Sequence, residues 1–305
     1  MGHPHHDGAA ALERRAMQAY RIACHADVAC AKPGNVRVGG PAHGMTARDF
    51  LRSARVSAAP LACLGLGIGE RVLHAVRATR AEVGCNTNLG IILLCAPLLH
   101  AWQRGEASAD LRLALGRSLR ELDVHDASCA FEAIALAAPA GLGHSARHDV
   151  RQPARASLLQ AMREAAERDL VAAQYATDYA DVFDLGLPAL RRERARRGRD
   201  CAAVALTFLD FLCAFDDSHV ARKHGTSCAR ELRQQALRCR SDVLAGADWQ
   251  LALQRLDRDC RQRGINPGTS ADLTVATLLA ERLGAAGQAL AGSGSGSPQG
   301  EAGKA

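Results

Sequence analysis

Short polar loops rich in glycine, proline and asparagine divide this chain into segments in which apolar residues recur with a helical period. Alanine, leucine and arginine dominate, β-branched residues are sparse, and aromatic residues make up only 4% of the sequence, a mixture that favours helices over strands. We therefore predict an all-α fold, a multi-helix bundle with polar, ligand-binding loops at helix starts. Helices are expected over residues 11–30, 65–80, 91–102, 110–122, 129–138, 158–184, 201–214 and 273–283, and after a polar interruption at 216–225 up to residue 264.

The chain shows no long linker and no internal repeat, which predicts one domain over residues 11–285. A loose start at residues 1–10 is expected to be flexible. The Gly/Ser-rich end at residues 286–305 is expected to be disordered.

Charge and cysteine usage exclude several classes of protein. The formal charge of +6 comes mostly from arginine, but no basic stripe is interleaved with aromatic residues, so we expect no nucleic-acid partner. The longest apolar run, residues 91–99, is too short to span a bilayer, so no membrane partner is expected. None of the 11 cysteines pairs at the spacing of a zinc or redox motif, which predicts buried free thiols in a cytoplasmic protein. A homodimer is compatible with this composition.

The segment at residues 266–273, Asn-Pro-Gly-Thr-Ser-Ala-Asp-Leu, brings a turn directly to the start of an apolar helix. Thr269 and Asp272 have the spacing of a capping box. Free amides at a helix start also favour anions, so Asn266 and Thr269 are candidate phosphate-binding residues. A well-capped helix is the alternative.

A second cluster, Asn86, Thr87 and Asn88, lies directly before another strongly apolar helix. Capping needs one such residue, and three favour contact with a phosphate or with ribose hydroxyls.

Carboxylates three residues apart form the third cluster, Asp178 and Asp181, within the helix expected over residues 158–184. On one helix they share a face. Mg²⁺ is held by one or two carboxylates together with substrate phosphates, so these residues are candidate metal ligands, against the alternative of a solvated acidic face.

Residues 216–225 mix both charges: Asp217 is a candidate metal ligand, while Arg222 and Lys223 can clamp an oligophosphate. A mutually neutralising surface loop is the alternative. Upstream, Lys32 and His43 lie in two further polar loops. Amides, hydroxyls, cations and carboxylates around an all-α core suit a Mg²⁺–nucleotide or sugar-phosphate ligand.

These clusters resemble, in order, the landmarks of the triphosphoribosyl-dephospho-CoA synthase family. The family has Pro-Lys-Pro-Gly, Gly-Ala-His-x-Asp-Met, Gly-Gly-Val-Asn-Thr-His-Lys-Gly, Asp-Thr-Asn-x-x-x-Arg-Gly-Gly and Ser-Pro-Gly-Gly-Ser-Ala-Asp-Leu. The corresponding segments are residues 31–34 (Ala-Lys-Pro-Gly), 41–45 (Pro-Ala-His-Gly-Met), 83–90 (Val-Gly-Cys-Asn-Thr-Asn-Leu-Gly), 217–225 (Asp-Ser-His-Val-Ala-Arg-Lys-His-Gly) and 266–273. The similarity covers about residues 11–285.

The resemblance implies an all-α enzyme that takes a triphosphoribosyl unit from ATP, joins it to a ribose hydroxyl of dephospho-CoA and releases adenine. It implies roles for Lys32, His43, Asn86, Thr87, Asp217, Arg222 and Asp272. We expect Mg²⁺ as the cofactor, His43, Asp217 and Asp272 as catalytic residues, and a small-molecule alcohol as acceptor.

The central motif departs from the family, because Asn88 and Leu89 replace its His-Lys pair and remove a cation. This version resembles a divergent branch found in archaea and methylotrophs. The alternative that this branch implies is a different alcohol acceptor, such as a ribitol-bearing precursor in tetrahydromethanopterin-type cofactor biosynthesis, with ATP or phosphoribosyl pyrophosphate as donor. A non-catalytic nucleotide-binding scaffold is the third alternative.

Overall fold

The computed structural model describes residues 4–38, 44–105, 110–145, 147–198 and 200–293, and these residues form fourteen α-helices and one π-helix without a β-sheet. The prediction of an all-α bundle is confirmed. The helices are α1 (Pro4–Ala29), α2 (Ala47–Ala62), α3 (Ile68–Val83), α4 (Leu89–Arg104), α5 (Leu111–Arg120), α6 (Val124–Ala137), α7 (Leu158–Ala165), α8 (Leu170–Ala176), η1 (Asp181–Gly186), α9 (Leu187–Arg197), α10 (Asp200–Ala214), α11 (Ser218–His224), α12 (Thr226–Leu244), α13 (Trp249–Gln262) and α14 (Gly268–Ser293). Among the described residues, no helix is both long and apolar enough to cross a bilayer.

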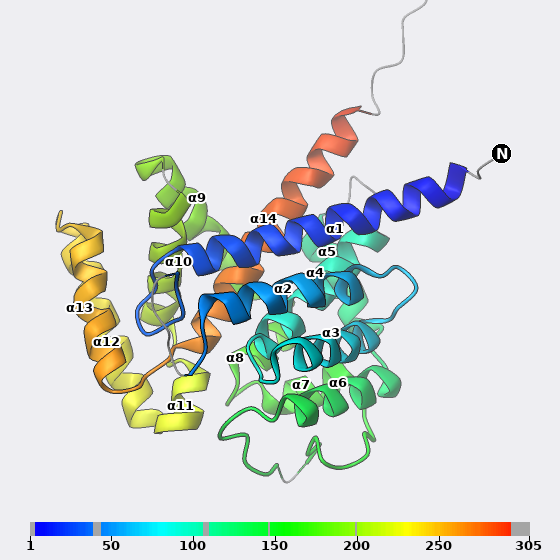
Figure 1. Ribbon diagram of the computed structural model, residues 1–305, viewed down its shortest axis with the longest axis horizontal. Coiled ribbons are helices and arrows are strands. Elements are labelled where there is room, and N and C mark those ends of the chain that lie inside the picture. Colours follow the sequence, from blue (N-terminus) through cyan, green and yellow to red (C-terminus); the bar gives the residue numbers. More distant parts are fainter. Residues whose placement is uncertain (1–3, 39–43, 106–109, 146, 199, 294–305) are drawn as a thin grey trace, which may run out of the picture.

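The helices, arranged as Figure 1 shows, enclose two apolar cores. The larger core surrounds α4, in which Ile92, Leu94 and Leu98 are fully buried. The smaller core lies between α10, α12 and α13, on the side of the molecule where α9 to α13 gather. Helix α14 contributes to both cores, Leu273 to the larger and Ala271 to the smaller. The start of α14 is therefore held where the two cores meet.

The helix expected over residues 158–184 is in fact divided into α7, α8 and η1. Pro97 inside α4 has no N–H to donate to the carbonyl one turn earlier, at Leu93. Tyr175 donates its hydroxyl to that Leu93 carbonyl at 2.7 Å, and Tyr179 donates to the Leu94 carbonyl at 3.0 Å. Between these anchors the backbone leaves the helix, with φ of 50° at Asp178 and 59° at Tyr179. Asp178 and Asp181 therefore do not share a helix face.

Other boundaries also differ from the expected ones. The polar interruption at residues 216–225 contains α11, because Asp217 caps that helix by accepting a hydrogen bond from Val220 N at 3.0 Å. Helix α1 begins at Pro4 and α14 runs to Ser293, beyond the domain limits expected from composition. Residues 294–305 lie outside the described part of the chain.

The structure corrects the expectation that all cysteines are free thiols. Cys30, which follows α1, and Cys201 in α10 form a disulfide that joins segments 171 residues apart. Of the remaining cysteines, Cys24, Cys95, Cys129, Cys239 and Cys260 are buried, as expected.

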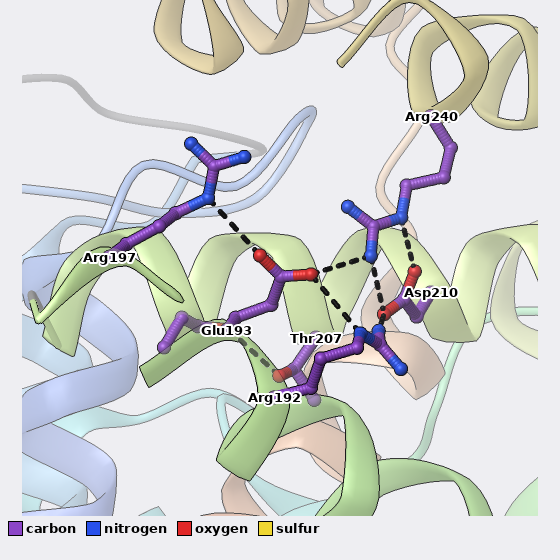
Figure 2. A network of polar contacts seen from close by, with 7 residues as sticks. Arg192, Glu193, Arg197, Thr207, Asp210 and Arg240 are labelled. Carbon is purple, nitrogen blue, oxygen red and sulfur yellow. Dashed lines mark hydrogen bonds and ion pairs between the residues drawn. The ribbon is translucent and has the colours of Figure 1, made fainter. Parts of the chain in front are cut away.

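A network of ions connects α9, α10 and α12 (Figure 2). Its centre is Glu193, which is 0% exposed and lies 2.7 Å from Arg240, 3.1 Å from Arg197 and 3.4 Å from Arg192. Asp210 completes the network at 2.7 Å from Arg240. Burial opposes ionisation of Glu193, but hydrogen bonds from Arg240 and Arg197 outweigh it and hold the pKa of Glu193 below its ordinary value. Two arginines of the arginine-rich run at residues 191–199, Arg192 and Arg197, therefore form ion pairs with a buried carboxylate.

Candidate active site

A cavity of about 990 Å³ opens where the starts of α4, α11 and α14 meet the loop between α6 and α7 and the start of α8. One part of its wall is apolar and includes Phe131, Ile134 and Met162. The polar part includes Asp27, Asn35, Asn86, Thr87, Asp169, Asp216, Ser218, His219, Arg222, Lys223, Asn266, Thr269 and Asp272. Seven of the residues expected from the sequence thus meet in one place: Asn86, Thr87, Arg222, Lys223, Asn266, Thr269 and Asp272.

Asp272 is the carboxylate of α14 that faces the cavity. Within the described part of the chain it accepts no hydrogen bond, and its side chain lies against Gly90 at the start of α4, where an added Cβ would be 2.6 Å from Asp272 Cγ. Burial, together with the negative charges of Asp217, Asp27 and Asp169, raises its pKa well above the ordinary value, and Arg222 opposes the shift. Asp272 therefore holds a proton more readily than a solvated carboxylate does.

The predicted capping box of Thr269 and Asp272 is replaced by a different arrangement. Thr269 already lies within α14, and its hydroxyl contacts Ser218 Oγ at 3.0 Å and accepts from His219 N at 3.2 Å. Asp217 satisfies the start of α14 instead, because its Oδ2 accepts from both the amide and the hydroxyl of Ser270 at 2.8 Å. Thr269 thus ties α14 to α11.

Asp217 does not lie on the cavity wall, in contrast to the expectation of a metal-binding or catalytic role. It is 1% exposed, and both its oxygens accept hydrogen bonds, from Val220 N and from Ser270. Burial raises its pKa, and these hydrogen bonds oppose the shift. The Asp217 carboxylate therefore joins the start of α11 to the start of α14, and in this position it supports the cavity wall.

Lys32 also lies behind the wall, although the sequence suggested that it binds phosphate. It is 1% exposed, its Nζ lies 3.0 Å from Asp27 Oδ1, and it donates a hydrogen bond to the Asp27 carbonyl at 2.5 Å. Burial raises the pKa of Asp27, and Lys32 opposes the shift. The positive charge of Lys32 therefore balances the negative charge of Asp27, which lines the cavity.

The Asn86–Asn88 cluster divides between the wall and the layer behind it. Asn86 accepts a hydrogen bond from Leu89 N at 3.2 Å and caps the start of α4. Thr87 donates to Ser53 Oγ at 2.6 Å, and both Asn86 and Thr87 face the cavity. Asn88 is 5% exposed and donates to Ser57 Oγ at 3.4 Å, away from the cavity.

The proposed metal pair is not brought to the cavity. Asp178 lies 3.4 Å from Arg120, and Asp181 accepts a hydrogen bond from Gln174 Nε2 at 2.6 Å. Within the described ranges, no three His, Cys, Asp or Glu side chains are grouped closely enough to hold a metal ion by themselves. His43 lies outside the described residues.

The wall carboxylates that sequence reasoning missed include Asp27 and Asp169. Asp27 carries a recognisable signal, since an acidic residue interrupts an apolar helix five positions before Lys32. Asp169 carries none, because it was assigned to the interior of one long helix. It in fact caps α8, accepting from Val171 N at 2.9 Å and Ala172 N at 3.2 Å.

Comparisons with known proteins agree with this geometry. No curated protein matches the sequence significantly. A solved structure from Archaeoglobus fulgidus, described as a candidate triphosphoribosyl-dephospho-CoA synthase, superposes with a TM-score of 0.61 at 26% identity, over 77% of this chain and 99% of that one. The profile of the CitG family, ATP:dephospho-CoA triphosphoribosyl transferase, matches residues 13–290. With all-α architecture and the shared motifs gathered at one cavity, this chain belongs to the CitG family of transferases.

Proposed function

We propose that this protein uses Mg²⁺-bound ATP to transfer a triphosphoribosyl unit to a hydroxyl group of dephospho-CoA. The observation that carries the proposal is the position of Asp272, a carboxylate on the cavity wall without a hydrogen-bond partner among the described residues. It lies next to the start of α4 and near the cationic Arg222.

The phosphate groups are assigned to the side of the cavity formed by α11 and the start of α4. Arg222 and Lys223 supply cations there, and Asn86 and Thr87 supply polar groups at the positive end of the 16-residue α4. Arginine suits this task because its guanidinium stays charged and forms charge-assisted hydrogen bonds with phosphate.

The reaction breaks the bond between C1′ of the ribose and N9 of adenine, and it forms a bond between C1′ and the acceptor oxygen. Positive charge develops on the ribose ring, as in glycoside hydrolysis. The acceptor hydroxyl loses its proton, and we assign that proton to Asp272, whose raised pKa suits a general base. Adenine leaves after gaining a proton from solvent.

Asp27 fits Mg²⁺ better than the residues expected from the sequence. It lines the cavity, and because its Oδ1 is paired with Lys32 Nζ at 3.0 Å, we assign Oδ2 to the cation. A single carboxylate suffices, because Mg²⁺ in nucleotide sites takes most of its other ligands from phosphates and water. When bound, Mg²⁺ supplies positive charge that offsets the triphosphate.

The direct test is incubation of the protein with Mg²⁺, ATP and dephospho-CoA, followed by chromatography for adenine. We expect adenine only when dephospho-CoA is present, and no adenine from Asp272→Asn. Binding of ATP without any consumption would instead support the scaffold alternative.

Leu89 favours an acceptor other than dephospho-CoA, because its apolar side chain lines the cavity at the position where the family has a lysine. We propose as the alternative that ribosyl phosphate is transferred to a different alcohol in tetrahydromethanopterin-type cofactor biosynthesis. Comparing donors identifies the donor, since ATP releases adenine and phosphoribosyl pyrophosphate releases pyrophosphate, and whether release depends on dephospho-CoA identifies the acceptor.

A further inference from the structure

Asp169 uses its two oxygens for different purposes. Oδ1 caps α8 by accepting from Val171 N and Ala172 N. Oδ2 accepts a hydrogen bond from Arg222 Nη1 at 3.1 Å, which connects the start of α8 with α11. Because the cap fixes the carboxylate on its own helix, the second oxygen presents a fixed anchor to Arg222.

Two of the three guanidinium nitrogens of Arg222 are held by the protein. Its Nε donates to the Ala140 carbonyl at 3.2 Å, and the loop approaches so closely that a Cβ on Gly141 would lie 2.6 Å from the Arg222 carbonyl oxygen. The Nη2 group makes no hydrogen bond to a described residue, and the side chain lines the cavity with 23% of its surface exposed. The guanidinium is therefore oriented by the protein while one donor group remains for a ligand.

We infer that Asp169 is a positioning residue for donor binding: it fixes the Arg222 guanidinium so that Nη2 meets a phosphate of the nucleotide. This inference rests on the proposed function, in which Arg222 binds phosphate. An arginine that is already ordered loses less side-chain entropy when it binds.

A purely electrostatic role for Asp169 predicts the opposite effect. A carboxylate on the wall repels phosphates, so its neutralisation would strengthen ATP binding. The positioning role predicts weaker binding, because the amide nitrogen of an asparagine cannot accept from Arg222. The sign of the change therefore separates the two roles.

The test is calorimetric titration of Asp169→Asn with Mg²⁺–ATP and with adenosine. Asparagine is as good a helix cap as aspartate, so α8 is expected to remain formed. We expect ATP affinity to fall roughly 5- to 10-fold, with adenosine affinity unchanged, because only ATP presents phosphates to Arg222. The matched control is Asp248→Asn, since Asp248 caps α13 with the same geometry, from Gln250 N at 2.7 Å and Leu251 N at 3.1 Å, and does not line the cavity.

A double-mutant cycle tests whether Asp169 acts through Arg222. We expect Asp169→Asn to weaken ATP binding no further in an Arg222→Gln background. Additive losses, unchanged ATP affinity or tighter binding by Asp169→Asn would overturn the inference while leaving the proposed function intact. Wild-type protein that binds adenosine and ATP equally well would overturn the proposed function itself.

Discussion

Replacing Glu193 by glutamine is expected to destabilise the protein by removing the centre of its buried ion network. Glu193 is 0% exposed and Arg240 only 10%, so the substitution leaves a largely desolvated guanidinium with Asp210 as its remaining anionic partner. Breaking a buried pair costs about 3–5 kcal/mol, and the remaining Asp210 contact favours the lower end. For a chain of 305 residues, about 3 kcal/mol corresponds to a fall in Tm of roughly 5 °C.

The assay is thermal unfolding followed by circular dichroism at pH 7, with Arg197→Ala as the control. Arg197 contacts the same carboxylate at 3.1 Å but is 30% exposed, so its loss is expected to cost at most about 1 kcal/mol. An equal fall in Tm for both variants, or a Glu193→Gln protein as stable as wild type, would refute the reasoning.

The stability difference also has an expected pH dependence. Because the pKa of folded Glu193 lies below its ordinary value of 4.5, its charge stabilises the fold above that pH, and this contribution is lost as the pH falls through the lowered value. The Tm curves of wild type and Glu193→Gln should therefore approach each other as the pH falls from 4.5 through the lowered pKa of Glu193. A gap that stays constant down to pH 3 would show that the ionised carboxylate is not the cause.

Three further substitutions test the active site and its support. Asp272→Asn is expected to lower the rate of adenine release at least ~100-fold with ATP affinity retained, measured by chromatography and calorimetry, because it removes the proposed base. Gly90→Ala is expected to lower kcat with little change in Tm, because the new methyl group pushes against the Asp272 carboxylate, whereas unchanged kcat would place Asp272 outside the chemistry. Asp217→Ala is expected to lower the free energy of unfolding by about 2–4 kcal/mol in chemical denaturation, because it leaves amides of Val220 and Ser270 without their acceptor.

Helix periodicity and polar loops were sufficient to predict the fold class and much of the polar cavity wall. The apolar run that became α4 and the cluster before it were identified from spacing alone. The break between α8 and η1 was not, because it depends on a contact between distant segments. Tyr175 and Tyr179 donate hydrogen bonds to carbonyls of α4 near Pro97. The sequence around Asp178 does not indicate that α4 is the partner of these side chains.

The same limit applies to the direction of single side chains. Asp217 and Asp272 look equivalent in the sequence, since each is an acidic residue near the start of a helix in a shared motif. One accepts hydrogen bonds from two helix starts, and the other faces the cavity. Which carboxylate is satisfied internally depends on how α11 and α14 meet, and spacing within either motif does not contain that information.

The division between wall and support nevertheless follows from helix geometry. Successive residues at a helix start point in directions about 100° apart, so neighbours in one polar loop cannot all face the same cavity. Ser218 lines the cavity but the preceding Asp217 does not, and Thr87 lines it but the following Asn88 does not, although all four are buried. The member of each pair that does not line the cavity bonds to amides or hydroxyls of neighbouring segments. Consecutive polar residues before an apolar helix therefore indicate both a binding surface and the layer that supports it, and a substitution in the supporting layer should affect stability before it affects catalysis.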